Sequence, residues 1–155
     1  MTVLVPNFKS HMLNRVAQGD MSIFEEDYDF TLTERTEYKN WNALSVAAAK
    51  GHFNLVNRLL EIEAVRENAT ADDNGALLLA AENGHLDVVN CLLEIAAVKA
   101  IAAIDDNAAL SLAAGNGHLK VVNRLLEIEA VIENAAADDN DALRSAAQNG
   151  HLEVV

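Results

Sequence analysis

Cysteine, proline and aromatic residues are scarce in this sequence. Cys91 is the one cysteine and Pro6 the one proline among 155 residues. A single cysteine excludes an intrachain disulfide and a cysteine-based zinc cluster. Aromatic residues make up 5% of the chain although hydrophobic residues make up 51%, so the apolar mass is mostly Ala, Leu, Val and Ile. Such a composition suits closely packed helices that have small residues between them.

Basic residues and long apolar runs are also lacking. The chain has 11 Lys and Arg residues against 24 Asp and Glu, for a formal net charge of −13. Because clustered Lys and Arg bind phosphate groups, we predict no nucleic-acid partner and no anionic membrane surface. No apolar run reaches the roughly 18 residues that a membrane span needs, and residues 1–9 do not read as a signal peptide. We expect a cytoplasmic protein whose acidity favours a protein partner with a basic surface.

One short motif, by contrast, occurs four times. A Gly-His pair begins it at Gly51, Gly84, Gly117 and Gly150, which are spaced 33 residues apart. A fixed period of this size is typical of a stacked repeat protein. In each copy an Ala-rich segment, interpreted as helix A, precedes the motif, and a segment rich in Val and Leu, interpreted as helix B, follows it. Helix B would carry a wide apolar stripe that faces helix A and the neighbouring repeats.

These repeats define the expected organisation of the chain. Residues 10–27 read as a degenerate first repeat, since Gly19 lies 32 residues before Gly51 and terminal repeats are usually atypical. The polar, acidic stretch 28–40 is expected to be an irregular connection. We predict a lead-in and capping repeat over 1–39, repeats over about 40–72, 73–105 and 106–138, and an incomplete repeat over 139–155.

Polar turns are expected at both ends of helix A. Asp72-Asp73-Asn74 and its equivalents precede the helix, and Asp and Asn side chains accept hydrogen bonds from the free N–H groups of a helix start. Asn83-Gly84 and its equivalents end the helix, because Asn and Gly tolerate the left-handed conformation that a tight reversal needs.

The 33-residue period, the Ala-Ala-x-x-Gly-His turn and the Val-Val-x-x-Leu-Leu helix resemble those of ankyrin repeats over residues 40–155, and more loosely over 10–27. The resemblance implies an all-α, ankyrin-type helical solenoid. The family's Thr-Pro-Leu-His opening is missing, however, and so is the Gly-Ala-Asp-Val-Asn that follows helix B. The segments 63–67, 96–100 and 129–133, which stand in the latter place, are rich in helix formers and lack glycine. We therefore predict short third helical turns there instead of the family's hairpin fingers.

Histidines follow the repeated glycines at positions 52, 85, 118 and 151. Packed helices lie roughly 8–10 Å apart. Equivalent histidines are therefore too far apart to share a zinc ion, whose ligand bonds are about 2 Å long. The resemblance implies that each histidine bonds the loop backbone and holds the turn. We favour this structural interpretation over a metal site.

Two other recurrent features have alternative interpretations. The acidic pairs at 72–73, 105–106 and 138–139 serve either as helix caps, which we favour, or as a dock for a basic partner or calcium. Asn57, Asn90 and Asn123 recur at one helix B position, which indicates either recent repeat duplication or a hydrogen bond between repeats.

A catalytic set is not evident. Ser45 and Ser111 have no histidine nearby in the repeat frame that could act as a base. Cys91 stands where two other repeats have Arg58 and Arg124, and it has no activating cation beside it in the sequence. The isolated glycines do not form a phosphate-binding loop. We predict a non-enzymatic protein without a cofactor or metal.

The predicted function is protein–protein interaction through a concave surface formed by the helix A segments. Scaffold positions barely change between repeats, whereas positions 45/78/111/144 and 49/82/115/148 do, which indicates either a binding surface or drift at unconstrained sites. By the resemblance, the protein-binding residues are Ser45, Ala49, Lys50, Leu78, Glu82, Asn83, Ser111, Gly115, Asn116, Arg144, Gln148 and Asn149.

The repeat style also resembles secreted effectors of intracellular bacteria, which would place the protein in a host cytosol. The alternative is the targeting segment of a larger enzyme. Because the fourth repeat stops five residues into helix B, we further expect a fragment, or a chain that has lost its C-terminal cap. Weak self-association would then cover the apolar residues Leu143, Leu152, Val154 and Val155.

Overall fold

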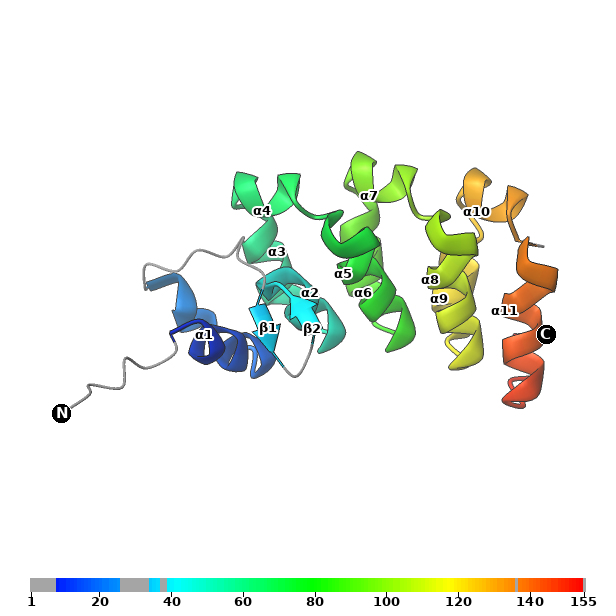
Figure 1. The fold of residues 1–155 in the computed structure, drawn as a ribbon, viewed down its shortest axis with the longest axis horizontal. Coiled ribbons are helices and arrows are strands. Elements are labelled where there is room, and N and C mark those ends of the chain that lie inside the picture. Colours follow the sequence, from blue (N-terminus) through cyan, green and yellow to red (C-terminus); the bar gives the residue numbers. More distant parts are fainter. Residues whose placement is uncertain (1–7, 26–33, 37–38, 136, 155) are drawn as a thin grey trace.

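Helix pairs stacked side by side make up most of the molecule (Figure 1). The computed structural model describes residues 8–25, 34–36, 39–135 and 137–154. Helix A is α2 (Ala43–Ala49), α5 (Ala71–Glu82), α8 (Ile104–Gly115) and α11 (Ala137–Gln148) in successive repeats. Helix B is α3 (Phe53–Leu60), α6 (Leu86–Leu93) and α9 (Leu119–Leu125). The predicted helical solenoid is therefore confirmed.

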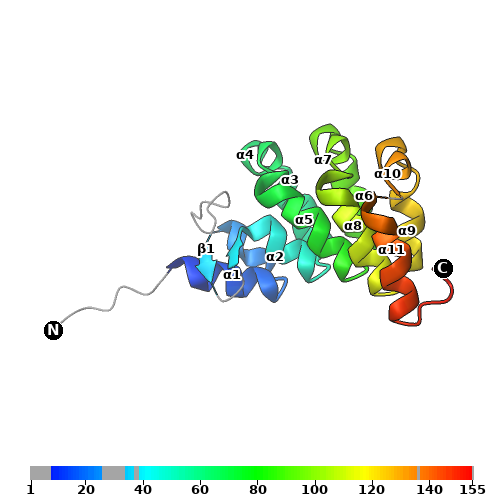
Figure 2. The same cartoon turned by 45° about the vertical axis from the view of Figure 1, so that its right-hand side comes forward.

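A short third helix follows each helix B. These helices are α4 (Glu63–Glu67), α7 (Ala96–Ala100) and α10 (Glu129–Glu133), and they project along one edge of the stack in both views (Figures 1 and 2). The residue just before each third helix, such as Ile95 before α7, is extended. A single valine in each third helix is buried, for example Val98. The prediction of helical turns in place of hairpin fingers is confirmed in these three repeats.

The core runs continuously through the stack. Helix B contributes the buried side chains Val88, Val89 and Leu92, as its predicted apolar stripe requires. Helix A contributes the paired alanines, such as Ala80 and Ala81, which are buried and allow neighbouring helices to approach closely. Burial of each such leucine or valine stabilises the fold by roughly 1.5–3 kcal/mol.

The degenerate first repeat is present in reduced form. Its helix A is α1 (Phe8–Ala17), and a 3₁₀ helix, η1 (Met21–Glu25), stands in the place of helix B. Ile23 of η1 is fully buried. The side chains of Asp20, Arg15 and Ser22 hold the turn between the two helices, with 2.7 Å between Arg15 Nε and Asp20 Oδ2 and 2.7 Å between Ser22 Oγ and Asp20 Oδ1.

The expected irregular connection over 28–40 is wrong for its described residues. Strands β1 (Glu34–Thr36) and β2 (Lys39–Trp41) form an antiparallel pair in which Glu34 lies opposite Trp41. Three-residue strands are too short for the alternating apolar pattern that identifies a strand in a sequence. The remaining residues of this stretch, 28–33 and 37–38, lie outside the described part of the chain.

Helix A begins earlier than predicted in α5, α8 and α11, whereas α2 begins at Ala43 as predicted. In α5 and α8 the acidic pairs stand within or beside the first turn, and the N-cap residues Thr70 and Ala103 make no side-chain capping bond. The acidic pairs are therefore not the N-cap residues of these two helices. The capping interpretation holds at α2, where Oδ1 of Asn42 accepts a hydrogen bond of 2.9 Å from the backbone N–H of Ser45.

Apolar side chains are exposed in the fourth repeat. Residues 152–154 form a turn, and Leu152 is 82% exposed. Leu143 is 47% exposed, whereas its equivalents Leu77 and Leu110 are 1% and 4% exposed. Val154, in contrast, packs partly buried against the core. Val155, the fourth residue of the predicted exposed set, lies outside the described residues.

Candidate protein-binding surface

The repeated histidines tie each repeat to the one before it. Nε2 of His52 lies 2.9 Å from the carbonyl oxygen of Ala17, Nε2 of His85 lies 3.1 Å from that of Ala49, and the equivalent bond of His118 to the previous repeat is 2.9 Å long. Because a carbonyl oxygen only accepts, each Nε2 must carry the proton. The predicted role of these histidines in holding the turn backbone is confirmed.

The glycine of each motif makes room for the next histidine. Gly84 has φ +74, a left-handed conformation that favours glycine. A Cβ atom built on Gly84 would also lie only 2.5 Å from Nδ1 of His118. Both backbone and space therefore require glycine here. The neighbouring Asn83 keeps a negative φ, so the left-handed conformation predicted for the pair belongs to the glycine alone.

Asparagines at the recurrent helix B position bridge the repeats. Oδ1 of Asn90 accepts a hydrogen bond of 2.7 Å from Nε of Arg124. Oδ1 of Asn57 accepts one of 2.8 Å from Sγ of Cys91. Of the two interpretations left open by the sequence, the structure thus supports a hydrogen bond between repeats.

A second set of asparagines is buried at the start of helix A. Asn74 and Asn107 have positive φ values of 68° and 64°. Nδ2 of Asn74 donates to the carbonyl oxygen of Val98 at 3.1 Å, and Nδ2 of Asn107 donates to that of Val131 at 2.9 Å. These bonds fasten helix A to the third helix that comes later in the chain. Sequence reasoning assigned these asparagines to capping, because a partner 24 residues away leaves no local signal.

The twelve predicted binding residues differ in exposure. Ser45 is 2% exposed and Ala49 is buried, so neither offers its side chain to a partner, and we leave both out of the surface considered below. The other ten are exposed or partly exposed: Lys50, Leu78, Glu82, Asn83, Ser111, Gly115, Asn116, Arg144, Gln148 and Asn149.

Four of these ten residues share one cleft. It has a volume of about 260 Å³, lies between α8 and α11, and is lined by Ser111, Leu112, Gly115, Asn116, Asp141, Ser145 and Asn149. Gly115 contributes no side chain, which leaves the cleft open where two other repeats have Glu82 and Gln148. We refer to these seven residues as the helix A cleft. Its lining is mostly polar and small, which suits hydrogen bonding to a partner.

Several residues at the cleft also make internal contacts. Nδ2 of Asn149 donates to the carbonyl oxygen of Gly115 at 2.9 Å, and so joins the two repeats in the way that histidine does elsewhere. Arg144 donates to Oδ1 of Asp141 at 2.7 Å. Asp141 and Ser145 were not among the predicted binding residues, because variation between repeats was apparent at two other positions in each helix A.

Negative charge is spread over several elements of each repeat. The charged side chains among the ten exposed predictions are Lys50, Glu82 and Arg144, which nearly balance. Exposed glutamates occupy the end of helix B and the third helices: Glu61, Glu63, Glu67, Glu94, Glu127, Glu129 and Glu133. The acidic pairs 72–73, 105–106 and 138–139 stand within the helix A segments, so the surplus of acid is shared between helix A and the projecting edge.

The described residues contain no group of three or more His, Cys, Asp or Glu side chains that could hold a metal ion. Burial and the nearby Glu94 carboxylate raise the pKa of the Cys91 thiol above its ordinary value. A raised pKa lowers the thiolate fraction, which is the nucleophilic form. Among the described helices, none is both long and apolar enough to cross a membrane.

Comparison with known proteins agrees with this architecture. A family model described as ankyrin repeats (3 copies) matches residues 16–102 and, in a second match, residues 77–155. No curated protein matches the sequence. The two matches together extend over most of the chain, including part of the degenerate first repeat. The chain belongs to the ankyrin-repeat family.

Proposed function

We propose that this protein binds a protein partner through its helix A face, with the helix A cleft at the centre of the contact. Ankyrin repeats are generally protein–protein interaction modules. The observation that carries the proposal is that Ser111, Gly115, Asn116 and Asn149, taken from positions that were predicted to bind, meet in one cleft.

The contacts that hold the stack together support this choice of face. The repeated histidines are occupied by bonds between repeats, and the helix B asparagines Asn57 and Asn90 bond the following repeat. By contrast, the side chain of Ser111 lines the open cleft, and Gly115, whose carbonyl oxygen accepts the bond from Asn149, has no side chain to fill it. Side chains that do not maintain the scaffold are free to vary with the partner.

The net charge of the chain favours a partner with a particular charge. The net charge of −13 creates a field that attracts a partner with a basic surface. The charged residues among the exposed predicted binding residues, Lys50, Glu82 and Arg144, nearly balance. We therefore expect the field of the whole chain to steer association over a long range. The association rate should therefore fall as added salt shortens the Debye length from about 10 Å at 0.1 M to about 3 Å at 1 M.

Site-specific crosslinking tests the proposed face. A photoreactive phenylalanine analogue replaces Ser111 in the helix A cleft or, in the matched control, the exposed Lys120 of α9. Illumination in a native lysate should give a discrete crosslinked protein at position 111 and not at position 120. The same product from both positions, or from position 120 alone, would count against the helix A face.

Filling the cleft is the complementary test. Gly115→Gln introduces the residue that position 148 already has, and a Cβ at Gly115 meets Ser145 at 3.4 Å, an ordinary contact. We expect Gly115→Gln to weaken binding of the crosslinked partner by at least about tenfold, the effect of losing one well-packed contact of about 1.4 kcal/mol. Lys120→Ala should leave binding unchanged, and circular dichroism should show equal helicity in both variants.

Two narrower roles rest on the sequence alone. Service as a secreted effector in a host cytosol rests on the style of the repeats, and service as the targeting segment of an enzyme rests on the lack of a catalytic set. The identity of the crosslinked protein separates them: a host protein supports the effector role, whereas a substrate of an enzyme from the same cell supports the targeting role.

A further inference from the structure

At one helix B position, the middle repeat has a different residue from the repeats on either side. Arg58, Cys91 and Arg124 occupy equivalent places in successive repeats. Arg124 donates through Nε to Asn90 of the preceding repeat and pairs through its second nitrogen with Glu127 at 3.0 Å. Arg58 likewise pairs with Glu61, three residues on, and its guanidinium lies 5.4 Å from the centre of the Phe24 ring. In both cases the arginine covers the junction with the preceding repeat.

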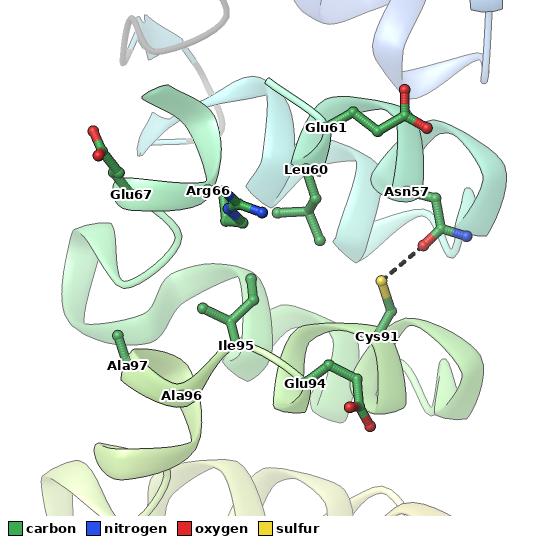
Figure 3. Close-up of a pocket in the computed structure, with 10 residues that line it drawn as sticks. All are labelled: Asn57, Leu60, Glu61, Arg66, Glu67, Cys91, Glu94, Ile95, Ala96 and Ala97. Atoms are coloured by element: carbon green, nitrogen blue, oxygen red, sulfur yellow. Dashed lines mark hydrogen bonds between the residues drawn. The ribbon is translucent and has the colours of Figure 1, made fainter. Parts of the chain in front are cut away.

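Cys91 is too short to cover this junction. A groove of about 670 Å³ lies there, between α3 and α4 of one repeat and α6 and α7 of the next. Figure 3 shows Cys91 at one end of the groove, with Sγ directed toward Asn57, and the side chains of Leu60 and Ile95 toward its middle. This space is distinct from the helix A cleft, because it is formed by helix B and the third helices.

The groove retains the acceptors that the missing arginine would use. Asn57 corresponds to Asn90, and Glu94 corresponds to Glu127. Glu94 forms no ion pair with any described residue, whereas Glu61 and Glu127 each pair with an arginine. Its carboxylate is turned away from Asn57 in Figure 3, but Glu94 is exposed, so rotation toward the groove is sterically open.

Charge at the groove is negative on balance. Glu61, Glu67 and Glu94 line it, and Arg66 is the cation among its lining residues. Arg66 extends beside Leu60, on the side of the preceding repeat (Figure 3). With Glu61 already paired to Arg58, Glu67 and Glu94 leave a net negative charge beside an apolar floor. The groove therefore favours a cation that carries apolar groups.

We propose that this groove binds an arginine side chain of a partner protein, presented on an extended segment with apolar neighbours. The guanidinium takes the place that Arg124 occupies in the next repeat and bonds Oδ1 of Asn57 and the carboxylate of Glu94. The apolar neighbours of that arginine lie on Leu60 and Ile95. The Cys91 thiol, a weak donor, gives up its bond to Asn57.

The size of the groove favours a peptide segment over free arginine. A volume of about 670 Å³ falls within the range of about 300–1,000 Å³ that is typical of sites for drug-sized ligands. A lone guanidinium would leave the surfaces of Leu60 and Ile95 uncovered. The site lies outside the helix A cleft, so it stands whether or not the proposed function of that cleft is correct.

The direct test uses defined peptides and the full chain. The probe is an acetylated, amidated pentapeptide with one arginine between leucines, and its comparison carries citrulline, which has the same shape without the charge. Nuclear magnetic resonance titration should move the amide signals of Asn57, Cys91 and Glu94. We expect citrulline to weaken binding at least tenfold, because charge-assisted hydrogen bonds are about twice as strong as neutral ones.

Variants of the protein test the same proposed contacts of the arginine side chain. Cys91→Arg restores the arginine of the neighbouring repeats, so it should fill the groove, abolish peptide binding and leave the Tm equal or higher. Glu94→Gln should weaken binding about fivefold, the upper value for one exposed ion pair. Glu127→Gln is the matched control at a filled junction and should leave peptide binding unchanged.

Several results would overturn the proposal. They are equal binding of the citrulline peptide, full binding by the Cys91→Arg variant, or signal changes confined to the helix A cleft. Equally tight binding of acetyl-arginine amide would show that no protein segment is needed. Concentration-dependent shifts at Asn57 and Glu94 without peptide would assign the groove to a second copy of the chain. A negative result in the crosslinking and Gly115→Gln experiments on the helix A cleft would not change the outcome of these measurements.

Discussion

Single side chains that cross from one repeat to another are the main local determinants of this stack. His85 both bonds the carbonyl oxygen of Ala49 and packs against Gly51. We expect His85→Ala to lower the free energy of unfolding by about 1–3 kcal/mol, since it leaves a carbonyl group unpaired and opens a gap. Urea denaturation measures this loss. A metal chelator should leave the Tm of the wild type unchanged, and stoichiometric zinc lost on the substitution would contradict the structural role.

Buried asparagine gives a second prediction at the residue scale. Asn107→Asp keeps the shape of the side chain but removes the N–H group that bonds Val131, and it buries a carboxyl group. We expect a loss of at least about 2 kcal/mol in the free energy of unfolding at neutral pH. Asn140→Asp is the matched control, because Asn140 has a similar φ of 63° but an exposed side chain, and it should change stability by less than about 0.5 kcal/mol. Equal losses would show that backbone conformation, not the buried bond, determines the effect.

At the scale of elements, a charged turn joins α1 to η1. Hydrogen bonds from Arg15 and Ser22 lower the pKa of Asp20 from 3.8 to about 2. Because the folded-state pKa is depressed, the stabilisation by the Asp20 carboxylate is complete above its ordinary pKa and is lost as the pH falls through about 2. Asp20→Asn should therefore be less stable than the wild type at pH 6, and the two should converge near pH 2. Thermal melts across this range test the prediction, which a difference independent of pH would contradict.

The sequence predicted those elements that depend on local composition. The third helices followed from helix-forming residues and the lack of glycine after helix B, and each is anchored by one valine such as Val98. The β1–β2 hairpin was missed because its strands are short and polar. The start of helix A was placed too late because Asn74 and its equivalents, with positive φ, look like turn residues although the helix continues through them.

The residues of the candidate surfaces could be predicted from the sequence only in part. Variation between repeats identified Ser111 and Gly115 of the helix A cleft, since a repeat sequence contains its own internal comparison, whereas Asn116 and Asn149 followed from the family resemblance. It also selected Ser45 and Ala49, which are buried, because variation alone does not reveal exposure. The replacement of arginine by Cys91 was visible in the sequence. The groove that it leaves was not, because its lining comes from two repeats.

At the scale of the whole molecule, stability depends on how many neighbours each repeat has. α5 packs between α2 and α8, and α6 lies between α3 and α9, whereas α11 packs on α8. In a stacked array, total stability is approximately the sum of repeat terms and interface terms. Interior repeats therefore open only when two interfaces are broken. This arrangement predicts a gradient of local stability along the chain.

Leucines at one equivalent position show the expected gradient. Leu77 and Leu110 are almost fully buried, whereas Leu143 is 47% exposed. Since burial of a leucine is worth roughly 1.5–3 kcal/mol, α11 should open more readily than α5. Native-state hydrogen exchange of the dilute chain should show at least about tenfold greater protection for residues 76–93 than for 142–148, a difference that corresponds to about 1.4 kcal/mol. His118→Ala, which removes a bond between repeats, should widen this gap. Equal protection of the two segments would mean that the chain opens as one cooperative unit, with coupling between repeats that exceeds the stability of any single repeat.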